Sequence, residues 1–164
     1  MLLQQQFMQC VRVKKLFKGQ ILYYPFLDFA TDQAEKGEDE INTTVSLVAM
    51  KEMYIDDEFI ADSTASPVCA TEEELKALPP TICFPAEYDV LKVEAQRFMD
   101  KLQAAGVRTE THMISMPHGF VENAYAAFIV EMFRTERTLK AIEDGSMKAE
   151  SERTFELIRN FFQE

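Results

Sequence analysis

The sequence is poor in the residues from which several kinds of functional site are built. It has two histidines and three cysteines among 164 residues. No acid or thiol stands at ligand spacing from a histidine, so we expect no metal site and no cofactor. The cysteines, at positions 10, 69 and 83, are odd in number and unevenly spaced. That pattern favours reduced thiols in the cytoplasm over a disulfide framework.

Long apolar runs and clustered basic residues are also missing. No stretch approaches the ~18–20 apolar residues of a membrane span, and the N-terminus does not read as a secretion signal. The net charge of −11 argues against a nucleic-acid partner, because phosphate binding needs clustered Lys and Arg. The single basic cluster, residues 14–18, is typical of a solvated helix end. We therefore expect a cytoplasmic protein without a membrane span or a nucleic-acid partner.

What is present fits one folded unit over residues 1–164. Hydrophobic residues are 47% and charged residues 27% of the chain, which is typical of globular proteins and too apolar for a disordered one. A chain of this length can bury a moderate core. No internal repeat, low-complexity tract or linker divides it.

Strand and helix patterns alternate along the chain. Short apolar strands are predicted over residues 21–24, 81–86 and 107–115. Helices are predicted over residues 2–17, 41–54, 72–78, 91–102, 120–142 and 149–162. Such alternation predicts a three-layer α/β fold with a parallel sheet and right-handed crossovers.

Two polar residues follow two of the predicted strands. Asp89 comes directly after the strand over 81–86, and His118 comes just after the strand over 107–115. Open parallel sheets place reactive groups beyond the C-terminal ends of their strands. A carboxylate can fix the tautomer of an imidazole, whose other nitrogen then takes a proton from a nucleophile. The order matches the last two members of a Ser…Asp…His triad, so we predict Asp89 and His118 as catalytic.

Both residues also have a simpler structural explanation. Asp89 can be the N-cap of the helix that follows, although Lys92 stands where Glu or Gln would complete a capping box. His118 can be a loop histidine bonded to backbone. The other histidine, His112, lies within a predicted strand, and we interpret it as structural.

The nucleophile of such a triad has no counterpart in the sequence. No Gly-x-Ser-x-Gly motif occurs in the 164 residues. Ser146 follows Gly145, but Lys148 occupies the place of the second glycine. Without a nucleophile, covalent catalysis is lost.

A set of short segments carries a family resemblance. They are Leu78–Thr81, Ala86–Glu94, Leu102–Val107 and Met116–Phe120, together with Ile21–Asp28 and Ala65–Pro67. As a set they resemble the C-terminal half of the hormone-sensitive-lipase-like carboxylesterases of the α/β-hydrolase superfamily. The resemblance implies a partial α/β-hydrolase fold and small carboxylic esters as substrates. It also implies that Asp89 is the triad acid and His118 the triad base.

The resemblance also shows departures. Family members carry a His-Gly-Gly oxyanion motif and a nucleophile elbow before the helix that residues 2–17 resemble, so we expect this chain to be a C-terminal portion that is inactive alone. Val93 stands where the family usually has an acid, and the two terminal helices exceed the usual single one.

Three further interpretations stay open. A non-catalytic pseudoenzyme would associate with itself or with a partner chain at the open edge of the strand over 21–24. A hydrolase from another branch of the same fold would act on different small molecules or peptides. In an esterase, Met50, Met53 and Tyr54 could line an acyl pocket, whereas methionines at helical spacing more often fill core gaps.

Overall fold

The computed structural model describes residues 17–126 and 133–163. Its strands are β1 (Gln20–Tyr23), β2 (Thr81–Phe84) and β3 (Thr109–Thr111). Its α-helices are α2 (Thr44–Tyr54), α3 (Glu72–Lys76), α4 (Lys92–Ala104), α5 (Phe120–Tyr125), α6 (Glu136–Glu143) and α7 (Ser146–Phe161). Short 3-10 helices span Gln33–Lys36, Asp57–Phe59 and Pro67–Cys69.

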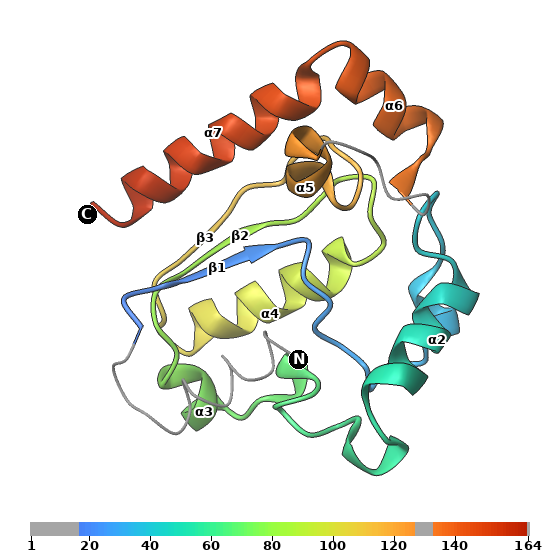
Figure 1. The fold of residues 1–164 in the computed structure, drawn as a ribbon. Helices are drawn as coiled ribbons and strands as arrows, with labels where there is room; N and C mark the ends of the chain where they lie inside the picture. The colour runs from blue at the N-terminus through green and yellow to red at the C-terminus, as the bar shows by residue number, and fades with distance from the viewer. Residues whose placement is uncertain (1–16, 127–132, 164) are drawn as a thin grey trace.

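The three strands form one parallel sheet in the order β1-β2-β3. Ile21 is opposite Ile82 in the first pairing, and Cys83 is opposite Thr111 in the second. Helices lie on both faces of the sheet: α4 on one, α5 and α7 on the other (Figure 1). The predicted α/β class with a three-layer, parallel arrangement is therefore confirmed.

Burial on both faces explains why the central strand is apolar throughout. All four residues of β2 are buried, and successive side chains point to opposite faces. Cys83 joins Leu22 of β1 in the core against α4. Ile82 and Phe84 belong to the second core, which α5, α6 and α7 cover. The chain therefore builds two apolar clusters, with the sheet between them.

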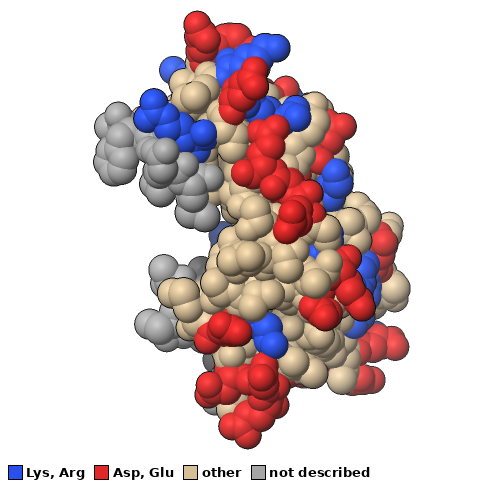
Figure 2. Space-filling view, turned by 90° about the vertical axis from the view of Figure 1, so that its right-hand side faces the viewer, with Lys and Arg blue, Asp and Glu red and all other residues tan. Residues whose placement is uncertain are grey.

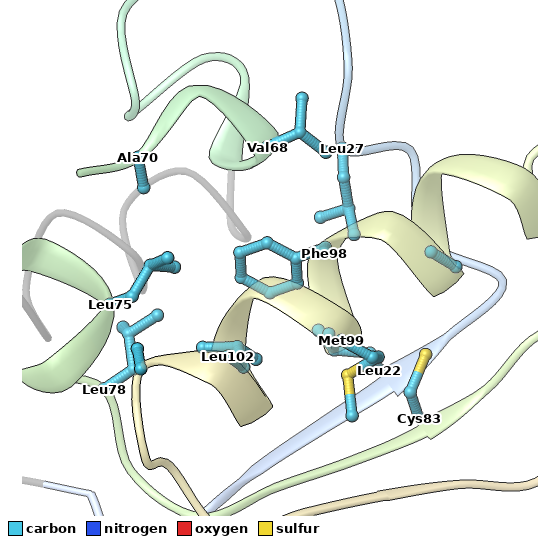
Figure 3. Packing of buried hydrophobic residues seen from close by; sticks show 12 residues of the cluster. Leu22, Leu27, Val68, Ala70, Leu75, Leu78, Cys83, Phe98, Met99 and Leu102 are labelled. Carbon is cyan, nitrogen blue, oxygen red and sulfur yellow. The ribbon is translucent and has the colours of Figure 1, made fainter. Parts of the chain in front are cut away.

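The cluster against α4 is centred on Phe98 (Figure 3). Its ring is fully buried among side chains from α3, α4, β1 and the loop before α3. Leu91, Ala95, Phe98 and Leu102 recur along α4 at helical spacing and are buried, whereas Val93 is 61% exposed. One face of α4 therefore packs on the sheet and the other meets solvent, as the apolar periodicity predicts.

Helix starts follow the capping residues in the sequence. The sequence Thr71-Glu72-Glu73-Glu74 has the pattern of a capping box, and the box is present: the Thr71 hydroxyl accepts from the Glu74 N–H, and the Glu74 carboxylate accepts from the Thr71 N–H. Thr43 and Ser46 form a second box. With this box, α2 begins at Thr44, three residues later than the start at residue 41 that the sequence pattern indicates.

The structure corrects three predicted elements in the second half of the chain. The helix predicted over 120–142 is not continuous: α5 ends before Ala126, whose backbone is extended, and Thr135 caps a new helix, α6. Helix α7 begins at Ser146 instead of residue 149, directly after Gly145 at φ +77°. The predicted strand over 107–115 is paired regularly only over Thr109–Thr111.

The predicted helix over 2–17 lies, except for its last residue, outside the described residues. None of the helices within the described ranges is long and apolar enough to cross a membrane. Acidic side chains form several patches on the face shown in Figure 2, with Lys and Arg scattered among them.

A buried cluster of charges ties the turn after β1 to α4. The Glu94 carboxylate accepts from the backbone N–H groups of Leu27 and Asp28 and forms an ion pair with Lys36 at 2.5 Å. The Lys36 and Glu94 side chains are 7% and 4% exposed. Arg97, one turn further along α4, pairs with Asp28 at 3.1 Å. A buried carboxylate is tolerated only with such partners.

Burial also changes the acidity of Glu94. Loss of water raises its pKa to about 7, against the opposing effects of Lys36 and the Leu27 N–H. The folded state then holds a proton that the unfolded state releases between about pH 4.5 and pH 7. Because the folded state binds more protons there, the free energy of unfolding falls as pH rises through that window.

We expect Glu94→Gln to remove this pH dependence. The unfolding free energy of the wild type, relative to Glu94→Gln, falls by on the order of 2–3 kcal/mol between pH 4.5 and pH 7.5. Urea unfolding at a series of pH values measures this difference in unfolding free energy. Asp100→Asn, on the exposed face of α4, is the control. A wild-type advantage that grows with pH contradicts the assignment.

Candidate active site

Backbone pairing continues past the ends of β2 and β3 and brings two loops together. Ala86 and Ile114 form an isolated parallel bridge. The Glu87 N–H then donates to the Ile114 carbonyl at 2.8 Å, and the Tyr88 N–H donates to the Met116 carbonyl at 3.3 Å. The residues that follow these bonds in each chain segment are therefore held side by side at the C-terminal edge of the sheet.

Those residues include Asp89 and His118, which meet in a direct hydrogen bond. His118 Nδ1 and Asp89 Oδ2 are 2.7 Å apart. The Asp89 side chain is fully buried, whereas the His118 side chain is 21% exposed. A carboxylate bonded at Nδ1 leaves Nε2 as the proton acceptor of the neutral ring. The arrangement can take a proton from a group placed at the exposed side of the imidazole.

The second oxygen of Asp89 is also hydrogen-bonded. Oδ1 accepts from the Leu91 N–H at 2.9 Å and from Asn42 Nδ2 at 3.0 Å. The bond to Leu91 is the local bond expected of an acid just before a helix. The N-cap of α4 is Leu91, which makes no side-chain cap bond, so Asp89 is not the N-cap that its simpler explanation predicts. Its Oδ1 bonds a backbone N–H two residues on, and its Oδ2 bonds His118.

Aromatic rings pack around the imidazole. The Tyr24 ring lies 4.7 Å from the His118 ring, and Phe133 stacks on it at 6.0 Å. Tyr24 has a positive φ of 32°, which is unusual for a residue with a side chain. Its hydroxyl donates to Glu122 of α5. Burial and this neighbouring carboxylate raise the pKa of Tyr24, so its hydroxyl stays a donor.

Gly119 allows the chain to turn directly behind His118. Its φ is +76°, a conformation that costs glycine little. An added Cβ would also lie 3.1 Å from Asn123 Nδ2 and 3.3 Å from the Phe133 ring. The glycine therefore lets α5 begin immediately after the histidine.

No serine in the chain is bonded to His118. All six lie within residues 17–126 and 133–163, and every hydroxyl donates to another group. The acceptors are the carbonyls of Thr43, Ile60, Ala141 and Met147 and the carboxylates of Glu74 and Glu87. The described residues therefore hold an acid and a base without a serine nucleophile beside them.

The three predicted pocket residues line a cavity of about 410 Å³. Met50, Met53 and Tyr54 form part of its wall, and the others are Gln20, Leu22, Phe26, Leu27, Phe29, Thr64, Ala65, Pro67 and Phe98. Met53 is 86% exposed, so it is not a core residue. Asp89 and His118 are not in the wall. The structure thus gathers the predicted pocket residues but does not join them to the predicted acid–base pair.

Sequence reasoning missed the polar support of the pair. Asn42 lies 47 residues before Asp89, and no local pattern connects the two. Tyr24 had a local signal, since it ends an apolar strand before a proline, but its contact with His118 depends on the fold. His112 pairs with Glu110 at 3.0 Å, consistent with a structural role. Within the described part of the chain, no group of three His, Cys, Asp or Glu side chains could hold a metal ion.

Comparison with known proteins adds a family match. The family described as alpha/beta hydrolase fold matches residues 2–122. No curated protein is significantly similar to the chain.

Solved structures of esterases are similar to the chain in fold. A thermostable esterase from Pseudomonas putida ECU1011 is 28% identical, with 70% of this chain and 37% of that chain covered and a TM-score of 0.60. The carboxylesterase EstE1, cloned from a metagenomic library, is 30% identical, with 70% and 40% covered and a TM-score of 0.59. Carboxyl esterase 2 from Tuber melanosporum is 24% identical, with 88% and 47% covered and a TM-score of 0.63. The chain thus spans less than half the length of each.

We expect Asp89→Asn to change the tautomer of His118. The carboxylate holds the proton on Nδ1, and losing a charged acceptor is worth about 1.5–3 kcal/mol, so the Nδ1–H to Nε2–H ratio falls at least tenfold. The ring ¹⁵N shifts report this ratio in a chain with two histidines. Glu110→Gln is the control, since it changes only the His112 signals. An unchanged His118 tautomer in Asp89→Asn contradicts the pairing.

Proposed function

Because this chain belongs to the alpha/beta hydrolase fold family, we propose that its site is the acid–base half of a carboxylic ester hydrolase. The observation that carries the proposal is the 2.7 Å bond between buried Asp89 and partly exposed His118. The family resemblance seen in the sequence is confirmed by the family match and the esterase structures. We further propose that residues 1–164 form a single C-terminal portion of the hydrolase domain.

The geometry supports defined roles for both residues. His118 Nε2 takes the proton of a serine hydroxyl as the serine oxygen bonds to the ester carbonyl carbon. The imidazolium then gives that proton to the leaving alcohol, and an acyl-serine remains. Water repeats the sequence and releases the acid. Asp89 keeps His118 in the Nδ1–H tautomer and stabilises its charged form.

Small carboxylic esters are the proposed substrates, supported by the esterases that share the fold. In this proposal Met50, Met53 and Tyr54 bind the acyl chain of the ester. Its support is the apolar wall of the cavity they line. His118 is not part of the cavity wall. An ester whose acyl chain lies in the cavity would therefore have to extend out of the cavity to reach the imidazole.

The serine is the missing component, and we propose that this polypeptide alone does not turn over esters. The 164 residues hold no Gly-x-Ser-x-Gly, and each serine hydroxyl donates to a group other than His118. Oxyanion donors of a nucleophile elbow would be absent with it, and those donors typically contribute 10²–10³-fold in rate.

An activity assay tests this proposal. We expect the purified chain to hydrolyse p-nitrophenyl butyrate no faster than His118→Ala, and a fluorophosphonate probe to label no serine. A rate well above buffer that His118→Ala abolishes would refute inactivity and reveal a nucleophile elsewhere in the chain. Mass spectrometry of the labelled peptide after proteolysis would then locate it.

A non-catalytic interaction module is the alternative, and the edge of β1 favours it. Among the described residues β1 pairs only with β2, and Ile21 on this strand is 41% exposed. Unpaired strand edges bind other strands. The transcript upstream of the Met1 codon separates the two functions: an in-frame Gly-x-Ser-x-Gly supports the esterase, and its absence supports the module.

If the module function holds, a second copy of the chain is the proposed partner. We expect sedimentation velocity to show dimers at tens of micromolar protein and Ile21→Lys to shift them to monomers, because edge lysines block strand pairing. Val93→Lys places the same charge on exposed α4 and is the control. A wild-type chain that stays monomeric contradicts self-association.

A cytoplasmic location is part of the proposal. Cys69 and Cys83 are both free thiols, which is typical of a reducing compartment. Cys10 lies outside the described residues. Burial raises the pKa of the Cys83 thiol to about 12, so this sulfur stays protonated in the core.

A further inference from the structure

The loop before α2 reaches the buried side of Asp89. Asn42 is 3% exposed and Asp89 is 1% exposed. Asn42 Nδ2 donates to Asp89 Oδ1 at 3.0 Å. This oxygen is the one that does not bond His118, so Asn42 acts on the carboxylate from the opposite side.

Asn42 is itself held by a second carboxylate. Its side-chain amide donates to Asp39 Oδ2 at 3.2 Å, and its backbone N–H donates to Asp39 Oδ1 at 2.7 Å. Asp39 Oδ2 also accepts from the Val90 N–H at 2.9 Å. Asp39 therefore joins the Asn42 loop to the backbone of the residue that follows Asp89.

The amide of Asn42 is chemically suited to this place. Both neighbours are carboxylate oxygens, so only the NH₂ end of the side chain satisfies them, and its two hydrogens serve one carboxylate each. A carboxylate at this position would add a third acceptor and leave Asp39 and Asp89 with backbone N–H donors alone on this side. The amide thus separates two like charges while bonding to both.

Arg137 of α6 contacts the residues next to this arrangement. The Arg137 guanidinium lies 3.9 Å from the centre of the Tyr88 ring, next to Asp89 in sequence. Arg137 also pairs with Glu40 at 3.4 Å, two residues before Asn42. The same side chain of α6 therefore contacts both loops that carry the bonded residues.

We propose that Asn42, supported by Asp39, is a positioning residue for the Asp89–His118 pair. It fixes the rotation of the Asp89 carboxylate so that Oδ2 faces His118 Nδ1. Without it, Oδ1 keeps only the Leu91 N–H, and the carboxylate can turn away from the imidazole. This inference rests on the proposed acid–base function but concerns a residue that acts through Asp89.

The test follows the His118 Nδ1 proton by NMR in the full 164-residue chain. Hydrogen bonds to charged groups contribute about 1.5–3 kcal/mol, so we expect Asn42→Ala to speed solvent exchange of this proton about tenfold. Asn42→Asp keeps the side-chain size but replaces the donors with acceptors, and we expect a larger loss. Asn160→Ala, on the exposed face of α7, makes the same change elsewhere and should leave the proton unaffected.

The outcomes separate this inference from the proposed function. If Asp89→Asn abolishes the protected proton and both Asn42 variants leave it unchanged, Asn42 is not a positioning residue and the acid–base pair stands. If Asp89→Asn has no effect, the pair itself is absent and both proposals fail. Where the Asn42 variants do not fold, Asp39→Asn decides, because it weakens the hold on Asn42 without adding a charge: faster exchange of the His118 proton supports the inference, and unchanged exchange overturns it. The His112–Glu110 pair is the internal reference, because a merely structural effect would change both histidines.

Discussion

The buried carboxylate of Asp89 is the constraint around which the C-terminal edge of the sheet is organised. A carboxylate that leaves water without partners costs several kcal/mol. Both oxygens of Asp89 are therefore bonded, to His118, Leu91 and Asn42. These partners come from three separate segments of the chain. Burying one charge thus requires the loop after β3, the start of α4 and the loop before α2 to meet at one point.

The parallel sheet makes this meeting possible. Pairing of β2 with β3 continues through the Ala86–Ile114 bridge, so the loops that leave the two strands stay in register up to the acid and the histidine. Apolar clusters on both faces hold the sheet in place. The buried Glu94–Lys36 pair holds the turn after β1 against α4. This turn follows Tyr24, whose ring packs against the imidazole.

The family and the chemistry of this chain lead to different conclusions about activity. The chain belongs to the alpha/beta hydrolase fold family and shares its fold with esterases of which it covers 37% and 40%. Its own serine hydroxyls all donate to backbone carbonyls or to the carboxylates of Glu74 and Glu87. The central feature of the site is a bonded Asp89–His118 pair with no serine hydroxyl bonded to the imidazole.

The sequence alone determined the α/β class, the three strands, the capping box at Thr71, the family, and the acid and histidine as candidates. All of these depend on local patterns: apolar runs, capping residues and short motifs near strand ends. Only the tertiary structure decided that Asn42 and Tyr24 support the pair, that Arg137 bridges two loops beside it, and that the predicted pocket residues line a cavity apart from it. Such contacts join residues far apart in the chain, and a hydrogen bond across 47 residues leaves no periodicity or spacing by which a sequence could reveal it.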